Sequence, residues 1–246
     1  MELEGKTALV TGGSRGIGKA IVGAFAREGA DVYFSFAANE EAAKATCKEY
    51  GLPSGRAFRA DVRDRKALGQ MFAKIEAEAG KLDVLVNNAG INKPEDFDKI
   101  TDDDWDEILG VNLKGPFVVT QEALGLLRKS DAGSVIHIGS VSGQYGGPRT
   151  AHYAASKAGL ISLAQVIARF LAADGIRSNT LAAGLVASEM AANALNNPAV
   201  KAAAASVLMK RFATTDEVAE TAVFLASDRS SYVTAQTINV NGGLYF

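Results

Sequence analysis

The chain has 246 residues, which suits one large α/β domain or two small ones around a sizeable buried core. A formal net charge of −2 excludes the strongly basic surface of a typical nucleic-acid-binding protein, so we expect no nucleic-acid partner. No apolar run approaches the ~18–20 residues of a membrane span, and the charged residues 1–6 lack the apolar core of a signal peptide. The only cysteine, Cys47, excludes an intrachain disulfide, and we interpret it as a half-buried helix residue rather than a reactive thiol. We therefore expect a soluble, cytoplasmic protein with no membrane partner.

Short apolar runs alternate with longer amphipathic segments along the chain. The runs predict strands at 7–11, 32–36, 56–59, 84–87, 135–138, 176–181 and 237–240. The amphipathic segments predict helices at 16–27, 40–50, 64–79, 104–128, 152–173 and 216–226, with an Ala-rich helical segment before the last of them. Thr101 with Asp104, and Thr214 with Glu217, have the spacing of capping boxes.

Strand and helix alternate throughout, and the near-continuous apolar strands indicate burial on both faces. This order predicts a Rossmann-type α/β fold, a doubly wound parallel sheet of about seven strands with helices on both faces. No linker-like segment or repeat interrupts the pattern, so we expect a single NADP-binding catalytic domain over residues 1–246. In such sheets, ligands bind beyond the carboxyl ends of the strands.

A glycine-rich turn follows the first predicted strand. Glycines at 12, 16 and 18 allow a tight turn, close approach of the backbone to a phosphate, and close packing of the following helix. The free N–H groups of that helix then face the anion. A purely structural turn is the alternative, but the position between a strand and a helix favours a dinucleotide site. The predicted contacts are Gly12, Ser14, Arg15, Gly16, Ile17 and Gly18.

The second strand favours NADPH over NADH. An NAD site usually ends this strand with a carboxylate that binds the ribose diol, whereas here no acid occurs between Asp31 and Glu40. Arg15 can instead face a 2′-phosphate, although a solvated loop cation is the alternative for it. Ser35, Ala37 or Asn39 would add small polar contacts. We predict NADPH/NADP⁺ as the cofactor.

Tyr153 and Lys157 are four residues apart near the start of a predicted helix, so their side chains share one face. A nearby ammonium favours the phenolate and is expected to lower the tyrosine pKa toward the working range. Ser140 closes the fifth predicted strand and can bind a carbonyl beside them; Ser142, in the following loop, is the competing serine. We predict a Ser–Tyr–Lys catalytic site.

Several further segments match one known family in order and spacing. They are 11–18, 61–62, 87–90, Asn112, Ser140, Tyr153, Lys157 and 239–243. With them the chain resembles the short-chain dehydrogenases/reductases over essentially its whole length.

This resemblance implies a role for each matching residue. Tyr153 is the general acid, and Lys157 lowers its pKa and holds the nicotinamide ribose. Ser140 orients the substrate carbonyl. Asn112 anchors a water in the proton relay, and a helix-bending polar residue is the local alternative for it. The remaining implied cofactor contacts are Asp61 and Val62 at the adenine, Asn88, Ala89 and Gly90 beside the ribose and cofactor cleft, Gly184 and Val186 under the nicotinamide, and Ser188 at its carboxamide.

Within the family, segments 11–18, 153–160 and 225–243 are similar to those of 3-oxoacyl-(acyl-carrier-protein) reductases. The resemblance implies a ketoreductase of fatty acid or polyketide biosynthesis. It would reduce a 3-oxoacyl thioester, bound to an acyl carrier protein or CoA, to the 3-hydroxyacyl form. It also implies a homotetramer, with the long fourth and fifth helices at one interface and the C-terminal strand region at another.

The chain departs from that pattern at three positions. The family usually has Pro-Gly after the sixth strand, whereas this chain has Ala183-Gly184, which predicts a more mobile substrate lid. Carrier-protein reductases often dock their acidic carrier through basic residues where this chain has Asp131 and Asp174, and acids there would repel it. Carrier docking therefore stays open, because the basic residues nearby can substitute, namely Arg128, Lys129, Arg169 and Arg177.

Two other functions stay open. One is an NADP(H)-dependent reductase or dehydrogenase of a free small ketone, polyol or quinone, with the same catalytic residues. The other is a dinucleotide-binding sensor or scaffold without catalysis, against which the intact Ser–Tyr–Lys set argues. We expect no metal, and we interpret the acidic run 102–104 as helix capping. We interpret His152 as a satisfied helix-start residue, with the substrate mouth as the alternative, and His137 as packing on a buried strand.

Overall fold

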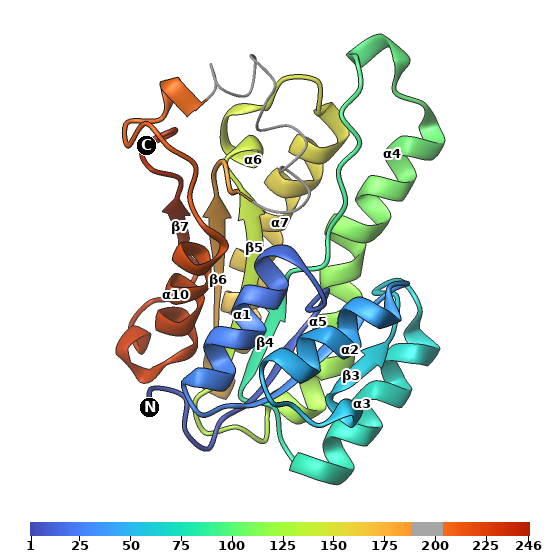
Figure 1. The fold of residues 1–246 in the computed structure, drawn as a ribbon, viewed down its shortest axis with the longest axis vertical. Helices are drawn as coiled ribbons and strands as arrows, with labels where there is room; N and C mark the ends of the chain where they lie inside the picture. Colours follow the sequence, from blue (N-terminus) through green and yellow to red (C-terminus); the bar gives the residue numbers. More distant parts are fainter. Residues whose placement is uncertain (188–203) are drawn as a thin grey trace.

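The computed structural model describes residues 1–187 and 204–246, which form three layers around a central parallel sheet (Figure 1). The sheet has seven strands in the order β3-β2-β1-β4-β5-β6-β7. The order reverses beside β1, because the chain adds β2 and β3 on one side of β1 and the later strands on the other; ligands bind at such a switch point. The strands are β1 (Thr7–Val10), β2 (Asp31–Phe36), β3 (Ala57–Arg59), β4 (Val84–Asn87), β5 (Ser134–Ser140), β6 (Arg177–Ala183) and β7 (Thr237–Val240).

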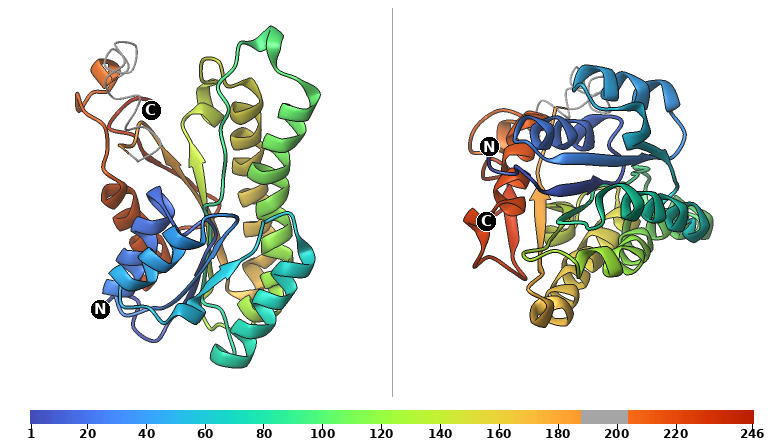
Figure 2. Two further views of the ribbon diagram at one scale, coloured as in Figure 1. Left: turned by 45° about the vertical axis from the view of Figure 1, so that its right-hand side comes forward. Right: turned by 90° about the horizontal axis from the view of Figure 1, so that it is seen from below.

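Helices cover both faces of the sheet (Figure 2). On one face lie α1 (Gly16–Arg27), α2 (Glu40–Glu49) and α10 (Thr215–Ala226); on the other lie α3 (Arg65–Ala79), α5 (Gly115–Leu127) and α7 (Ala151–Leu171). Side chains alternate across each strand, so Phe34 of β2 joins the first core and Tyr33 joins the second. Shorter elements complete the described chain: α4 (Asp102–Leu109), α6 (Ser142–Tyr145), the π-helix η3 (Gly110–Lys114), and the 3₁₀ turns η1 (Ser54–Arg56), η2 (Phe97–Lys99), η4 (Ala172–Asp174) and η5 (Asp228–Ser230).

The predicted doubly wound parallel sheet is confirmed, with strands in all seven expected places. The strand β5 is longer than predicted, because Gly139 and Ser140 continue to pair with Ala182 and Ala183. The interpretation of Cys47 as an unreactive helix residue agrees with its burial in α2, which raises the pKa of its thiol. The predicted Ala-rich helical segment falls largely outside the described residues.

The prediction of one long helix over 104–128 is wrong in one respect. The chain forms α4, then one π-helical segment, η3, and then α5. The extra residue of the π turn accompanies hydrogen bonds that the Asn112 side chain makes outside the helix, to the backbone of Ile91. The capping box expected at Thr101 is half formed: its hydroxyl accepts from the Asp104 N–H, while the Asp104 carboxylate binds Lys93. The box at Thr214 and Glu217 is complete.

The segment Ala151–Asp174 corrects the expectation that no segment has the length of a membrane span. Its mean hydropathy is 1.2, so by length and composition alone it is long and apolar enough to cross a membrane. In this fold it is α7 and the following turn, and it packs along β5 and β6 through a face that includes Ser156, Lys157 and Leu160. We assign it to the core on this ground.

Candidate functional site

The candidate site lies where β1, β4 and β5 end, at the same edge of the sheet (Figure 1). Parallel strands bring their carboxyl ends together, so segments distant in sequence meet there. The glycine turn follows β1, Asn88 to Gly90 follow β4, Ser140 ends β5, and Tyr153 lies in the first turn of α7.

The turn after β1 has a backbone that side chains would disrupt. Gly12 and Gly16 have φ of 67° and 56°, the left-handed region that favours glycine. A Cβ on Gly18 would lie 2.2 Å from the carbonyl oxygen of Gly12 and 2.4 Å from Nδ2 of Asn88. The start of α1 therefore sits directly against the turn. Arg15 is its N-cap and makes no side-chain cap, which leaves the first N–H groups of α1 for an anion.

The turn is fastened to the end of β4 by side chains. The Thr11 hydroxyl accepts from the N–H groups of Asn88 and Ala89, both at 3.0 Å. Nδ2 of Asn88 donates to the carbonyls of Thr11 at 2.9 Å and Gly12 at 3.1 Å. The Asn88 side chain is thus committed to shaping the turn. Sequence reasoning missed Thr11 as a functional position; a threonine directly before the glycines was the signal.

These features fit a nicotinamide dinucleotide. The turn offers a backbone cradle that Cβ atoms would fill, and the described residues give Arg15 no acidic partner although it is exposed. A carboxylate that would repel a 2′-phosphate is also absent from the end of β2, since the sequence has no acid between Asp31 and Glu40.

On the adenine side, the structure changes some expectations. Both oxygens of Asp61 bind the Arg63 guanidinium, at 3.0 and 2.7 Å, and this pairing lowers the pKa of the carboxyl. Val62 is buried and packs against Gly115, where a Cβ would lie 2.6 Å away. Ser35 is also buried, and its hydroxyl has no hydrogen-bond partner among the described residues. Of the residues predicted to add small polar contacts to the cofactor, Ser35 therefore has a covered hydroxyl, whereas Ala37 is exposed.

Ser140 and Tyr153 meet beyond β5. Ser140 is buried, its Oγ accepts from the N–H of Ser142 at 3.1 Å, and its hydroxyl lies close enough to the Tyr153 phenol to lower the pKa of that group. The short helix α6 turns the chain back after β5 and so delivers α7 beside the strand end. Of the two serines considered from the sequence, Ser140 is the one that reaches the tyrosine.

Lys157 lies one turn further along α7 and is buried. Its Nζ donates to the carbonyl of Ile138 at 2.7 Å and lies 5.7 Å from the centroid of the Tyr153 ring. Burial lowers the pKa of this ammonium to about 8. A lysine poised near neutral pH can take up and release a proton, as a relay requires.

The pKa of Tyr153 departs from the sequence expectation. Burial of the phenol raises it, and the hydrogen bond with Ser140 opposes that rise. The lowering expected from Lys157 is not seen, because that ammonium binds the Ile138 carbonyl and carries a lowered pKa itself. A raised pKa keeps the phenol protonated at neutral pH and makes it a weaker acid than an unperturbed tyrosine.

Asn112 is held by hydrogen bonds to both polar atoms of its side chain. Nδ2 donates to the carbonyl of Ile91 at 2.9 Å and to Oγ of Ser156 at 3.2 Å, and Oδ1 accepts from the N–H of Ile91 at 2.9 Å. Ser156 in turn donates to the carbonyl of Tyr153 at 2.7 Å. A Cβ on Gly90 would lie 3.3 Å from Oδ1 of Asn112 and 3.6 Å from Nζ of Lys157, so these polar groups share one corner. Sequence reasoning missed Ser156, whose place between Tyr153 and Lys157 was the signal.

The remaining predicted contacts follow β6. Gly184 donates to the carbonyl of Val240 at 3.0 Å, and a Cβ there would lie 2.7 Å from Cα of Asn241, so the position requires glycine. Val186 is half-buried and pairs with Ala213 in an isolated bridge. Ser188 and the lid expected after Ala183 lie outside the described residues.

The two histidines differ in their surroundings. His137 is buried in β5 as predicted, 3.4 Å from Nδ2 of Asn87 and 3.3 Å from Oγ of Ser178. Burial, with a smaller contribution from Lys157, lowers its pKa to about 3, so it is neutral. The expectation that His152 is satisfied locally is wrong: it is buried, and neither ring nitrogen has a hydrogen-bond partner among the described residues.

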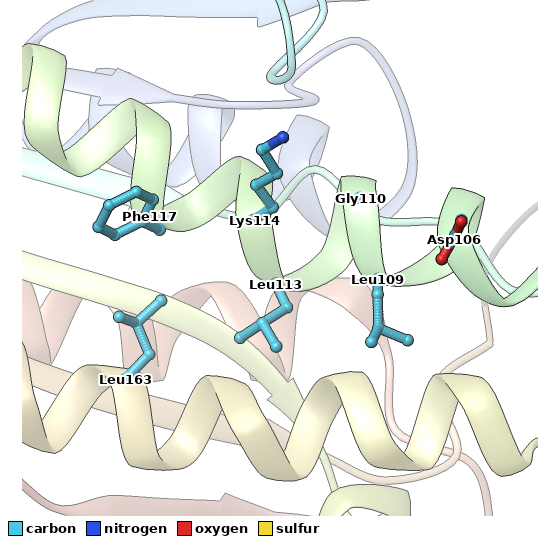
Figure 3. A pocket seen from close by; sticks show the side chains of 7 residues that line it. All are labelled: Asp106, Leu109, Gly110, Leu113, Lys114, Phe117 and Leu163. Atoms are coloured by element: carbon cyan, nitrogen blue, oxygen red, sulfur yellow. The ribbon is translucent and has the colours of Figure 1, made fainter.

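A groove of about 640 Å³ lies away from this constellation, between α7 and the α4–η3–α5 segment (Figure 3). Leu109 and Leu113 point toward α7, and Leu163 points back from it. The groove is lined by Asp106, Leu109, Gly110, Leu113, Lys114, Phe117 and Leu163. None of these residues was predicted for the site. The groove is therefore a surface feature separate from the candidate site.

Comparison with known proteins agrees with this geometry. A family model described as enoyl-(acyl carrier protein) reductase matches residues 12–245. Together with the fold and the Ser–Tyr–Lys constellation, this shows that the chain belongs to the short-chain dehydrogenase/reductase family, and it is an oxidoreductase that uses a nicotinamide cofactor.

The chain is similar to 3-oxoacyl-(acyl-carrier-protein) reductases FabG of several bacteria. It is 40% identical to that of Thermotoga maritima over 246 residues, which covers 99% of each chain. It is 38% identical to that of Staphylococcus aureus over 242 residues, 98% of each chain. For Salmonella typhimurium the identity is 38% over 245 residues, which covers 100% of this chain and 99% of the relative.

Proposed function

We propose that this protein is an NADPH-dependent ketoreductase that reduces a 3-oxoacyl thioester to the 3-hydroxyacyl form. The observation that carries the proposal is the meeting of Ser140, Tyr153 and Lys157 at the end of β5, beside a dinucleotide turn. The full-length similarity to proteins named as 3-oxoacyl-(acyl-carrier-protein) reductases supports the substrate class.

In this mechanism two hydroxyls receive the substrate carbonyl. Ser140 donates a hydrogen bond to the carbonyl oxygen and orients it, and Tyr153 delivers the proton to the same oxygen. A bound nicotinamide supplies the hydride. Lys157, with a pKa of about 8, relays a proton toward the phenol, and Asn112 holds the far end of the relay beside Gly90. Ser140, Tyr153 and Lys157 thus each donate or transfer a proton at one defined atom, which suits the reduction of a carbonyl.

The choice of NADPH is supported by charge. Arg15 is exposed beside the glycine turn, and the loop after β2 carries no acid before Glu40. Glu40 itself pairs with Lys44 at 3.0 Å. A 2′-phosphate would meet a guanidinium rather than a carboxylate there.

The carrier of the thioester is either an acyl carrier protein or CoA. Asp174 pairs with Arg128 at 2.9 Å, and Lys129 pairs with Glu76 at 2.7 Å. Arg177 donates to three backbone carbonyls and is half-buried, so it does not replace a docking cation. These pairs reduce the positive charge that an acidic carrier would need there, while the exposed Arg169 makes no ion pair among the described residues.

We also propose a cytoplasmic homotetramer. Phe117 of α5 lines the groove of Figure 3 and is exposed, and α7 carries two further exposed apolar residues, Val166 and Phe170. Such a face is typical of a subunit interface. It coincides with the fourth and fifth predicted helices, where the family resemblance implies one interface.

A substrate panel with NADPH consumption as the readout tests the proposal. Acetoacetyl-CoA, a longer 3-oxoacyl-CoA and the matching acyl-carrier-protein thioester are compared with a free ketone, a quinone and a trans-2-enoyl thioester. We expect kcat/KM for the 3-oxoacyl thioesters to exceed that of the other compounds by at least about a hundredfold, since remote binding energy of the thioester contributes to the transition state. Turnover of only the free ketone or quinone would instead establish a reductase of small carbonyl compounds.

A further inference from the structure

Arg59 is the last residue of β3 and lies beside the end of β2. The register pairs Arg59 with Phe36, and the N–H of Ala60 donates to the carbonyl of Phe36 at 2.9 Å. Nε of Arg59 donates to the carbonyl of Ala37 at 3.4 Å. The guanidinium is thus held over the first residues after β2 while the side chain stays exposed.

The glycine turn lies on the other side of the same strand end. Because β2 lies between β1 and β3 in the sheet, the turn after β1 flanks β2 opposite Arg59. The N–H of Gly13 donates to the carbonyl of Ser35 at 3.0 Å, and Arg15 follows in the same turn. The end of β2 therefore has one arginine segment on each side.

Arg15 and Arg59 have no acidic partner within ion-pair distance among the described residues. The arginines around them are neutralised: Arg56 pairs with Asp31 and Glu78, and Arg63 pairs with Asp61. Two guanidiniums without a counter-charge therefore remain beside the end of β2. The sequence places no acid there either, since none occurs between Asp31 and Glu40. Two cations that flank one strand end without a counter-charge indicate a site for an anion.

We propose that Arg59 is a second specificity-determining cation, which acts with Arg15 to select the 2′-phosphorylated dinucleotide. The proposal rests on the assignment of NADPH made above. The bond from Nε to the Ala37 carbonyl leaves both terminal nitrogens of Arg59 to donate, and it orders the side chain before a ligand binds. Ala37 is small and exposed, so its side chain places neither bulk nor negative charge beside Arg59.

Binding measurements test this proposal without turnover. The dissociation constants of NADP⁺, NAD⁺, 2′,5′-ADP and 5′-AMP are measured by calorimetry for the full chain and for Arg59→Gln, Arg59→Lys, Arg15→Gln and Arg229→Gln. We expect Arg59→Gln to weaken NADP⁺ and 2′,5′-ADP by about tenfold, the effect of one charge-assisted hydrogen bond, and to change NAD⁺ and 5′-AMP less than twofold. Arg59→Lys should restore part of the loss. Arg229, exposed and paired with Glu2, is the matched control, and its variant should bind all four ligands as the parent does.

The outcomes separate this inference from the proposed function. If Arg59→Gln weakens both dinucleotides equally, or neither, while Arg15→Gln removes the preference for NADP⁺, then Arg59 plays no part in selection and this inference alone is overturned. If the unchanged protein itself binds NADP⁺ no more tightly than NAD⁺, the NADPH assignment is lost and this inference falls with it. A loss confined to the phosphorylated ligands supports it, together with a weaker dependence of NADP⁺ binding on ionic strength in Arg59→Gln than in the parent.

Discussion

At the scale of single residues, the site depends on how burial and hydrogen bonds set the pKa values of two groups, the Tyr153 phenol and the Lys157 ammonium. Burial raises the pKa of Tyr153 above its ordinary value and lowers that of Lys157 to about 8, so the pKa of the phenol lies above that of the ammonium, whereas the sequence analysis expected Lys157 to lower it. The Ser140 hydroxyl is the group that favours the phenolate. Ser140 therefore partly offsets the effect of burial on the phenol.

Replacing the phenol tests this assignment most directly. We expect Tyr153→Phe to reduce kcat by at least about a hundredfold, because a positioned general acid contributes roughly 10²–10⁴-fold. The dissociation constant of NADP⁺ should change less than about twofold. Steady-state kinetics and calorimetry measure the two quantities. Tyr232→Phe, at a fully exposed tyrosine, is the control and should leave both unchanged. A Tyr153→Phe enzyme with parental kcat would remove the proposed acid.

At the scale of elements, α1 can pack directly against the turn after β1 only because Gly18 has no Cβ atom. Gly18 is in the first turn of a helix, where alanine normally stabilises. Its neighbours nevertheless exclude a methyl group, since a Cβ would lie 2.2 Å from a backbone carbonyl oxygen. Whether a helix glycine can be replaced by alanine therefore depends on the element that packs against it.

We expect Gly18→Ala to weaken the binding of NADP⁺ and of NAD⁺ alike, each by more than about tenfold. The turn must shift to accept the methyl group, and its N–H groups would then no longer point at the same phosphate. Gly69→Ala provides the matched control. Gly69 lies inside α3 with no atom within 4 Å of an added Cβ, so alanine there should raise the free energy of unfolding by about 0.5–1 kcal/mol and leave binding unchanged. Calorimetry and urea unfolding measure the two effects. Unchanged dinucleotide binding by Gly18→Ala would contradict the close packing of turn and helix.

At the scale of the whole molecule, the sheet centre contains a histidine that stays neutral. His137 has a pKa of about 3 in the folded chain and an ordinary value of 6.5 when exposed. Above pH 6.5 the group is neutral in both states and costs nothing. Between pH 6.5 and about 3 only the unfolded chain takes up the proton, so the free energy of unfolding falls as the pH falls.

The loss amounts to about 1.4 kcal/mol for each pH unit below 6.5, or on the order of 2 kcal/mol at pH 5. We expect His137→Gln, which keeps hydrogen-bonding atoms for Asn87 and Ser178, to remove most of this dependence between pH 7 and pH 5. Urea unfolding of both proteins at the two pH values measures it. Equal slopes with pH in the parent and the variant would show that other groups cause the acid sensitivity.

Sequence by itself determined the fold class and most of the site, since both depend on local patterns. Apolar runs spaced by helices identify a parallel sheet, and glycine positions, the i,i+4 pair Tyr153–Lys157 and the strand-ending Ser140 then fall at one edge of that sheet. Only the tertiary structure decided the burial of Ser35, the π turn at Asn112, the raised pKa of Tyr153 and the approach of Arg59 to Ala37. Each of these depends on which atoms of distant segments surround a group. Periodicity in a sequence gives the direction of a side chain from its own element, but desolvation and contacts across strands are set by neighbours that the fold alone brings together.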